Sequence, residues 1–156
     1  MLHRQVAYWQ IECDPDATRA AYVALPIGTD CSCDQCRNFN VAAGKIFPSE
    51  FITLANSMGI DPSKPAELMH WCREPSGLYL TGGWFHFVGR IVSGADAHEH
   101  EDGTGVIQYQ QLAPDIEVGL TRHANLVPDT FIGSAVCQLE FQTRVPWVLI
   151  DVEPAP

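Results

Sequence analysis

The stretch Leu78-Tyr-Leu-Thr-Gly-Gly-Trp-Phe-His-Phe-Val-Gly-Arg-Ile-Val92 is a long apolar segment near the middle of the chain. In a strand, alternate side chains point to opposite faces. Trp84 and His86 therefore share one face, while Phe85 and Phe87 share the other. Because both faces are apolar, the pattern predicts a central strand that is covered on both sides.

Further strands are predicted on either side of this segment, from alternating apolar and polar residues bounded by turn residues. The clearest is 134–144, in which Cys137 and Leu139 are expected to face the core, and Gln138 and Glu140 are expected to face outward. The other predicted strands cover residues 4–13, 68–73, 106–112, 116–122 and 147–152.

Three short helices are predicted within the first 60 residues. Asp14 and Pro15 are typical of the start of the first helix, Asp34 is the expected N-cap of the second, and Ser49 is the expected N-cap of the third. Gly59 is expected to end the third helix. Helices that precede a long run of strands indicate an α+β fold. We expect one domain over 1–156, with the N-terminal helices packed on one face of a mainly antiparallel sheet of about six strands.

The charge balance argues against several partners. Nine basic residues against 19 acidic ones give a net charge of -10, and no basic run occurs. Such a chain repels phosphate backbones and anionic lipid surfaces, so neither nucleic acid nor a membrane is an expected partner. No apolar h-region of a secretory signal follows Arg4, and no window reaches the roughly 18 apolar residues of a membrane span. We therefore expect a soluble, cytoplasmic protein.

Reactive chemistry is concentrated between Thr29 and Phe39. Three of the six cysteines lie there, in the pattern Cys31-x-Cys33-x2-Cys36. These spacings allow neighbouring thiolates to reach one ion, and zinc prefers such sulfur ligands in tetrahedral sites. The predicted metal ligands are Cys31, Cys33, Cys36 and Cys72, with His70 or Cys13 as alternative fourth ligands. Zinc is favoured over an iron–sulfur cluster, which needs a fourth cysteine.

Two other interpretations of these cysteines stay open. Cys36 is expected in the first turn of a helix, where the helix dipole and the neighbouring Arg37 favour a thiolate suited to redox or nucleophilic chemistry. Alternatively, the three are reduced thiols that fill a tight loop. Cys13 and Cys137 lie on apolar strand faces, where a cysteine usually serves as a small core residue.

The motifs Cys31-x-Cys33-x2-Cys36-Arg-Asn-Phe39 and Gly82-Gly-Trp-Phe-His-Phe-Val-Gly89 support one resemblance. In these two motifs the chain resembles a family of small bacterial proteins of unassigned activity. The likeness extends over about two thirds of the chain, and it implies a single compact domain that stands alone. It implies no catalytic or binding residues.

Two histidine-containing segments are further candidates. His86 lies among aromatic residues and needs a hydrogen-bond partner or a ligand, so it is either a satisfied core histidine or part of a ligand pocket with Trp84. His98, His100 and Asp102 lie between two glycines. They have the residue types of a divalent-cation site but are more typical of a solvated loop.

Three functions are compatible with these features. The sequence favours a zinc-stabilised binding or interaction domain whose partner is a protein or a small molecule. The alternatives are a small-molecule binder with a pocket near Trp84 and His86, and a thiol- or metal-dependent enzyme that uses the cysteine loop. No Gly-rich phosphate loop, G-x-S-x-G or H-E-x-x-H motif indicates a common enzyme class.

Overall fold

The computed structural model describes residues 1–99, 105–151 and 153. Its three α-helices are α1 (Pro15–Val23), α2 (Asp34–Ile46) and α3 (Ser49–Ser57), and a short 3-10 helix η1 covers Asp129–Phe131. The strands are β1 (Leu2–Val6), β2 (Trp9–Cys13), β3 (Glu67–Arg73), β4 (Tyr79–Ser93), β5 (Gln110–Ala113), β6 (Ile116–Thr121) and β7 (Val136–Val145).

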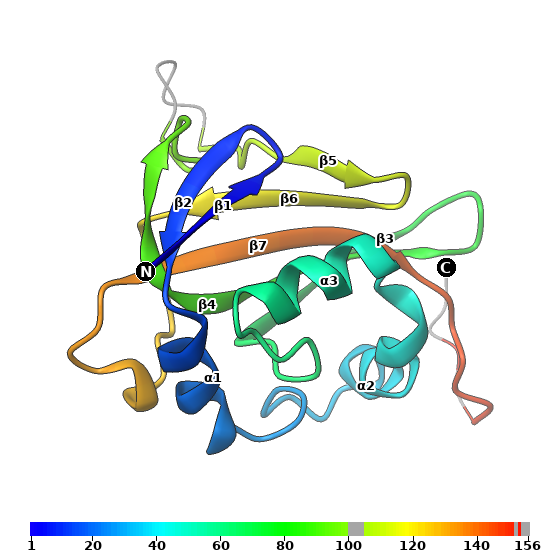
Figure 1. Ribbon diagram of the computed structural model, residues 1–156. Coiled ribbons are helices and arrows are strands. Elements are labelled where there is room, and N and C mark those ends of the chain that lie inside the picture. The colour runs from blue at the N-terminus through cyan, green and yellow to red at the C-terminus, as the bar shows by residue number, and fades with distance from the viewer. Residues whose placement is uncertain (100–104, 152, 154–156) are drawn as a thin grey trace.

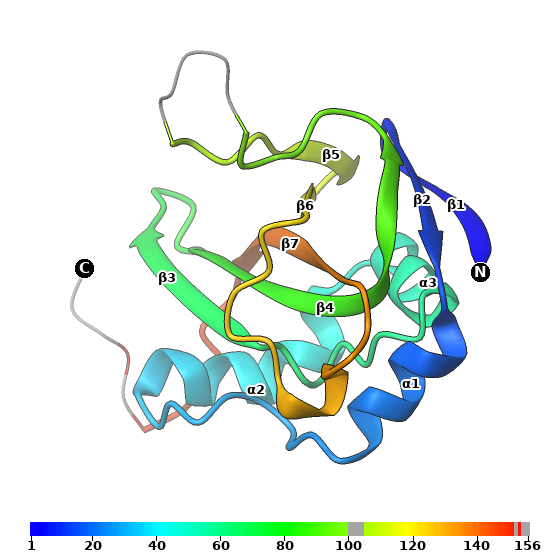
Figure 2. The same cartoon turned by 90° about the vertical axis from the view of Figure 1, so that its left-hand side faces the viewer.

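The seven described strands form one sheet, and every pairing between them is antiparallel. The helices gather on one side of this sheet (Figures 1 and 2). The α+β prediction is therefore confirmed, with a sheet of seven strands among the described residues. None of the described helices is long and apolar enough to cross a membrane.

Strand β4 organises the sheet, as its apolar faces predicted. One side pairs with β7 over Tyr79–Val88, while the other side pairs with β3 through Tyr79–Trp84 and with β2 through Gly89–Ser93. The strand bends along its length, so that β2 and β3 point in different directions (Figure 2). At the β3 end, Gly83 lets the strands approach closely, because a Cβ there would lie 2.3 Å from the carbonyl oxygen of Glu67.

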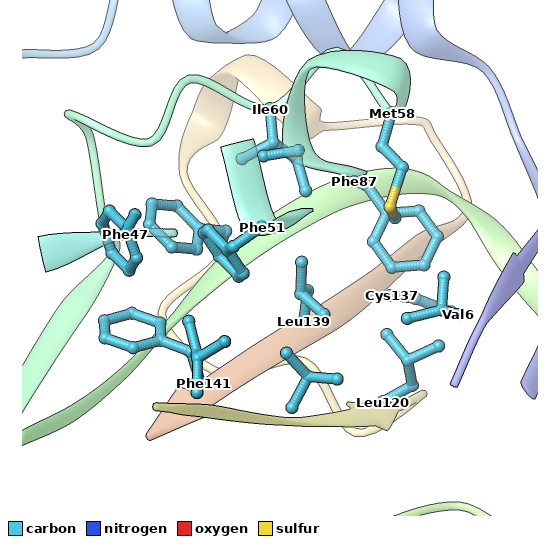
Figure 3. Packing of buried hydrophobic residues seen from close by; sticks show 14 of the residues in the cluster. Val6, Phe47, Phe51, Met58, Ile60, Phe87, Leu120, Cys137, Leu139 and Phe141 are labelled. Carbon is cyan, nitrogen blue, oxygen red and sulfur yellow. The ribbon is translucent and has the colours of Figure 1, made fainter. Parts of the chain in front are cut away.

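The main core lies between the helices and the face of β4, β7 and β6 that the helices cover. Phe47 and Phe51 stack with ring centroids 4.6 Å apart, and Phe47 meets Phe141 of β7 at 5.2 Å. Leu139 and Leu120 continue this apolar surface across the sheet (Figure 3). Cys13 and Cys137 are buried in the same core, which confirms their prediction as packing residues.

The opposite face of the sheet is also covered, although by loops. Gly119 of β6 lies against Ala97, with 3.2 Å between the Cβ of Ala97 and the position of an added Cβ. Asn125 receives a hydrogen bond from Trp84 Nε1 and donates one from its backbone N–H to Gln138 Oε1. Gln138 and Glu140 are consequently buried. Both side chains lie on the face of the sheet away from the helices, as predicted. The expectation that this face exposes them is wrong, because the loops cover it.

Two predicted strands differ from the structure. Residues 4–13 form the β1–β2 hairpin, turned at Ala7 and Tyr8, with Ala7 in the left-handed region at φ 48°. The expected strand over 147–152 is wrong for 147–151, which form no strand, and Val152 lies outside the described residues. The backbone N–H groups of Val148 and Leu149 donate hydrogen bonds to the side-chain oxygen Oδ1 of Asn38. They therefore bond to a helix side chain and not to a neighbouring strand.

The helix caps follow the sequence in part. Asp14 Oδ1 accepts a hydrogen bond from the N–H of Ala17 at 2.9 Å, which confirms the predicted start of α1. Ser49 is the first residue of α3 rather than its N-cap, because Pro48 takes the cap position without a side-chain hydrogen bond. Asp34 likewise lies inside α2, and its N-cap is Cys33.

Candidate metal centre

The three clustered cysteines lie where the chain turns into helix α2. Cys33 has extended backbone angles and is the N-cap of the helix, and its Sγ accepts a hydrogen bond from the N–H of Cys36 at 3.4 Å. The Sγ of Cys33 is therefore the capping acceptor of α2, a role that the side-chain oxygen of Asp or Ser usually has at the N-cap.

The donor atoms of Cys31, Cys33 and Cys36 all lie within 4.8 Å of one another. Cys31 and Cys33 are exposed, whereas Cys36 points into the protein and is buried. The short loop before α2 thus brings together three sulfurs that can bind one ion from one side. All six cysteines are free thiols.

A fourth donor comes from the sheet. His70 on β3 places its Nε2 3.3 Å from the Sγ of Cys36. Leu68, two residues earlier on the same strand, is buried in the core, so alternation along β3 turns both side chains toward the helices. The sequence named His70 as an alternative ligand, and the fold places its Nε2 beside Cys36, although the donor atoms that all lie within 4.8 Å of one another are those of the three cysteines and do not include His70.

Cys72, the predicted fourth ligand, is exposed and does not belong to this group of donor atoms. Regular alternation places residues 70 and 72 on the same face of a strand. Here the register between β3 and β4 shifts between His70 and Cys72, because Trp71 is an extra residue in β3. A bulge of this kind breaks the alternation, so Cys72 no longer follows the direction of His70.

The electrostatics of the group distinguish its members. Hydrogen bonds from the backbone and thiol of Cys33 lower the pKa of Cys31. Burial raises the pKa of Cys36 to about 12, with a further increase from its hydrogen bond to Cys31. Burial also lowers the pKa of His70, which keeps its imidazole neutral near pH 7 and able to bind a metal.

Polar contacts join the first turns of α2 to residues 146–151. Asn38, two residues after Cys36, is buried and donates from Nδ2 to the carbonyl of Pro146 at 3.0 Å. Arg37 pairs with Asp34 at 2.9 Å and with Asp151 at 3.1 Å. These contacts fix the first turns of α2, which carry Cys36.

Trp84 and His86, the predicted pocket pair, lie together, because Trp84 Nε1 and His86 Nε2 both contact the carbonyl oxygen of Asn125. His86 lines a cleft of about 160 Å³ together with Thr29, Asp30 and Lys64, and Trp84 is not among its lining residues. Within the described structure, His86 Nε2 also contacts the carbonyl of Asn125 at 2.9 Å. Burial lowers the pKa of His86. His86 is thus a hydrogen-bonded, buried histidine at the wall of a small cleft.

The histidines of the 94–105 loop are only partly described, because His100 and Asp102 lie outside the described residues. The donor atoms of Asp96, Glu99 and His123 lie within 4.8 Å of one another. Arg122 already supplies a cation there, since its guanidinium lies 3.7 Å from Asp96 and 3.6 Å from Glu99. The sequence did not foresee that His98 turns inward to contact Glu140.

Comparisons with known proteins add no further identification: no family model, no curated protein and no solved structure matches the chain. The resemblance drawn from the two motifs therefore stays a prediction. The metal centre has to be judged by the chemistry of its own residues.

Proposed function

We propose that the protein is a zinc-stabilised binding domain in which Cys31, Cys33, Cys36 and His70 hold one Zn²⁺. The observation that carries the proposal is the contact of 3.3 Å between His70 Nε2 and the Sγ of Cys36, one of three sulfurs that lie within 4.8 Å of one another. Three thiolates and one imidazole are a known tetrahedral zinc ligand set.

The donor types favour zinc over other common ions. Thiolates and imidazoles suit Zn²⁺, whereas Mg²⁺ and Ca²⁺ prefer oxygen ligands. A [2Fe–2S] or [4Fe–4S] cluster usually takes four cysteines, and the described group supplies three. Zn²⁺ also favours the thiolate form of its ligands, so it would take the place of the proton on Cys36.

Four protein ligands make the proposed site structural rather than catalytic, because a catalytic zinc keeps one position for water or substrate. Zinc would join the start of α2 to β3, two segments 34 residues apart in the chain. It would thereby fix the 29–36 loop, whose residues Thr29 and Asp30 line the cleft beside His86. The metal would stabilise a binding surface, and the partner would be a protein or a small molecule.

Metal analysis of protein purified without chelator tests the proposal. We expect close to one equivalent of zinc per chain, and loss of most of it in Cys36→Ser. The matched control is Cys137→Ser, which removes a buried cysteine that lies in the core, away from the proposed site. Folded wild-type protein that contains no zinc, and takes up none when it is added, would overturn the proposal.

The cleft supports a second candidate function, the binding of a small molecule without any role for metal. Thr29 Oγ1 is buried beside the Cys36 thiol, and Thr29 lines the cleft. Lys64 and His86 also line the cleft and provide further polar groups. A fragment screen by NMR tests this candidate. Binding has to shift the amides of Thr29 and Asp30, and a screen in which no fragment does so contradicts it.

A further inference from the structure

Two of the clustered cysteines have fixed positions on the first turn of helix α2. Cys33 is the N-cap, and Cys36 is the third residue of the helix. The N–H of Cys36 donates to Cys33 Sγ at 3.4 Å, and the N–H of Arg37 donates to the carbonyl oxygen of Cys33 at 2.9 Å. Residues three apart on a helix are neighbours, so the backbone of this turn holds the two thiols side by side.

The two thiols differ in their exposure to solvent. Cys33 is exposed, whereas Cys36 is buried, with an exposed fraction of 2%. Their sulfurs lie within 4.8 Å of each other, so only a local movement is needed to join them. An oxidant in solution therefore reaches Cys33 first, and Cys36 lies beside it as the thiol that converts the oxidised sulfur into a disulfide.

Cys31 is the competing partner, since its sulfur belongs to the same group and is also exposed. Only one residue separates Cys31 from Cys33, and a disulfide across so short a span departs from the usual geometry. Cys31 also lies outside α2, in the irregular segment before it. The capping bond instead holds Cys33 against Cys36, which favours a bond between these two.

We propose that Cys33 and Cys36 form a site of reversible oxidation, at which a peroxide converts the two thiols into a disulfide and zinc is released. Hydrogen peroxide transfers one oxygen to the sulfur of Cys33, which gives a sulfenic acid and one water. The sulfur of Cys36 then attacks the sulfur of Cys33, the disulfide forms, and the oxygen leaves as a second water. In zinc-loaded protein the two sulfurs start as thiolates, so two protons from solvent complete the two waters.

Release of the metal follows from the loss of two ligands, and this part of the inference rests on the proposed function. The thiolate is the form of cysteine that binds a metal, and a disulfide has no thiolate. Cys31 and His70 alone would remain for the zinc, without the other half of its tetrahedral ligand set. A dithiol reductant supplies two electrons and two protons to the disulfide, which restores both thiols and the site.

The test treats the full chain, as purified, with hydrogen peroxide, and a parallel sample with peroxide followed by dithiothreitol. Remaining thiols are alkylated, and the tryptic fragment 20–37 is analysed by mass spectrometry, because it contains Cys31, Cys33, Cys36 and no other cysteine. We expect one alkyl group, located on Cys31, after peroxide and three after dithiothreitol. A chromogenic chelator should detect close to one equivalent of zinc released by peroxide.

Three variants identify the bonded pair. Cys33→Ser keeps the helix cap, because Ser is a favoured N-cap residue, and it should leave Cys31 and Cys36 both open to alkylation after peroxide. Cys31→Ser is the matched variant in the same loop, and it should form the disulfide as the wild type does. The control is Cys72→Ser, which removes an exposed cysteine outside the group and should behave as the wild type.

Two results would overturn the proposed pair. One is an alkyl group on Cys33 instead of Cys31, which would indicate a bond between Cys31 and Cys36. The other is a wild-type fragment that still carries three alkyl groups after peroxide. Zinc-loaded protein with this second result contradicts the oxidation site alone. Protein that forms the disulfide but never contained zinc, and takes up none when it is added, contradicts the zinc centre alone.

Discussion

His70 Nε2 on strand β3 lies 3.3 Å from the Sγ of Cys36 in the first turn of helix α2. This contact joins the sheet to the loop that carries the other two clustered cysteines. The same geometry distinguishes His70 from Cys72, two of the three residues that the sequence offered as the fourth ligand, because the bulge at Trp71 turns Cys72 away from the direction of His70. The cobalt and X-ray absorption predictions below depend on this geometry.

Cobalt substitution should distinguish His70 from Cys72. Co²⁺ takes up the ligand set of zinc and absorbs visible light according to its ligands and coordination. We expect Cys72→Ser to give the same spectrum and stoichiometry as the wild type. His70→Ala should bind Co²⁺ at least about tenfold more weakly, because one ligand is lost.

The contrary result would be a normal spectrum for His70→Ala together with a loss of absorbance in Cys72→Ser. That outcome would restore the ligand set expected from the sequence. It would require β3 to lose its bulge when metal binds.

Asn38 is predicted to hold the segment 146–149 against α2. Asn38→Ala removes one donor to Pro146 and the acceptor for Val148 and Leu149. We expect a loss of about 1–3 kcal/mol in the free energy of unfolding, the usual range for buried hydrogen-bond groups. Hydrogen exchange at the amides of Val148 and Leu149 should become faster.

The control is Asn40→Ala on the same helix. Asn40 is exposed, so its replacement should change the free energy of unfolding by less than about 0.5 kcal/mol. Unchanged exchange at Val148 and Leu149 in Asn38→Ala would show that the segment is held by other contacts.

Two glycine replacements should have opposite effects on stability. In Gly83→Ala the new Cβ would lie 2.3 Å from the carbonyl oxygen of Glu67, so β3 and β4 have to separate. We expect a cost of at least about 2 kcal/mol. Gly44 is an exposed position within α2, with no atom within 4 Å of an added Cβ. Gly44→Ala should therefore stabilise the helix by about 0.5–1 kcal/mol.

Urea unfolding of both variants measures these differences. If Gly83→Ala is as stable as the wild type, β3 does not lie against β4 at this spacing. A destabilised Gly44→Ala would contradict the helix assigned to this part of the chain.

His86 should make the stability depend on pH. Burial lowers its pKa in the folded protein, so the unfolded chain binds a proton more readily below its ordinary pKa near 6.5. The stabilising effect of neutral His86 is therefore complete above about pH 6.5 and declines as the pH falls below that value. We expect the stability difference between the wild type and His86→Gln to shrink between about pH 7.5 and pH 5.

Urea unfolding at several pH values gives this difference directly. A constant difference for His86→Gln would show that His86 gains as much from its hydrogen bonds as it loses by burial.

Much of the fold could be predicted from the periodicity of apolar residues and from the residues that mark helix ends. The two apolar faces of β4 indicated the central strand, and Asp14 with Pro15 located the start of α1. The β1–β2 hairpin was missed because its turn residues, Ala7 and Tyr8, are not the Asn-Gly or Asp-Gly residues that usually mark such turns. Ala7 adopts a positive φ although nothing in its chemistry favours one.

The three cysteines of the candidate site could be predicted from the sequence, but the proposed fourth ligand could not. The spacing of Cys31, Cys33 and Cys36 is local and can be read from the sequence. The choice between His70 and Cys72 depends on one extra residue in β3, and a bulge leaves no clear mark in a single sequence. Burial of Glu140 was equally hidden, since loops far away in the chain cover it.

Zinc K-edge X-ray absorption of the protein as purified tests the central claim most directly, because it counts the sulfur and nitrogen ligands of the bound ion. We expect three sulfurs at about 2.3 Å and one nitrogen at about 2.0–2.1 Å. His70→Ala should lose the nitrogen contribution. Four sulfurs around the zinc, or fully folded protein that binds no zinc, would contradict the proposed Cys31, Cys33, Cys36 and His70 centre.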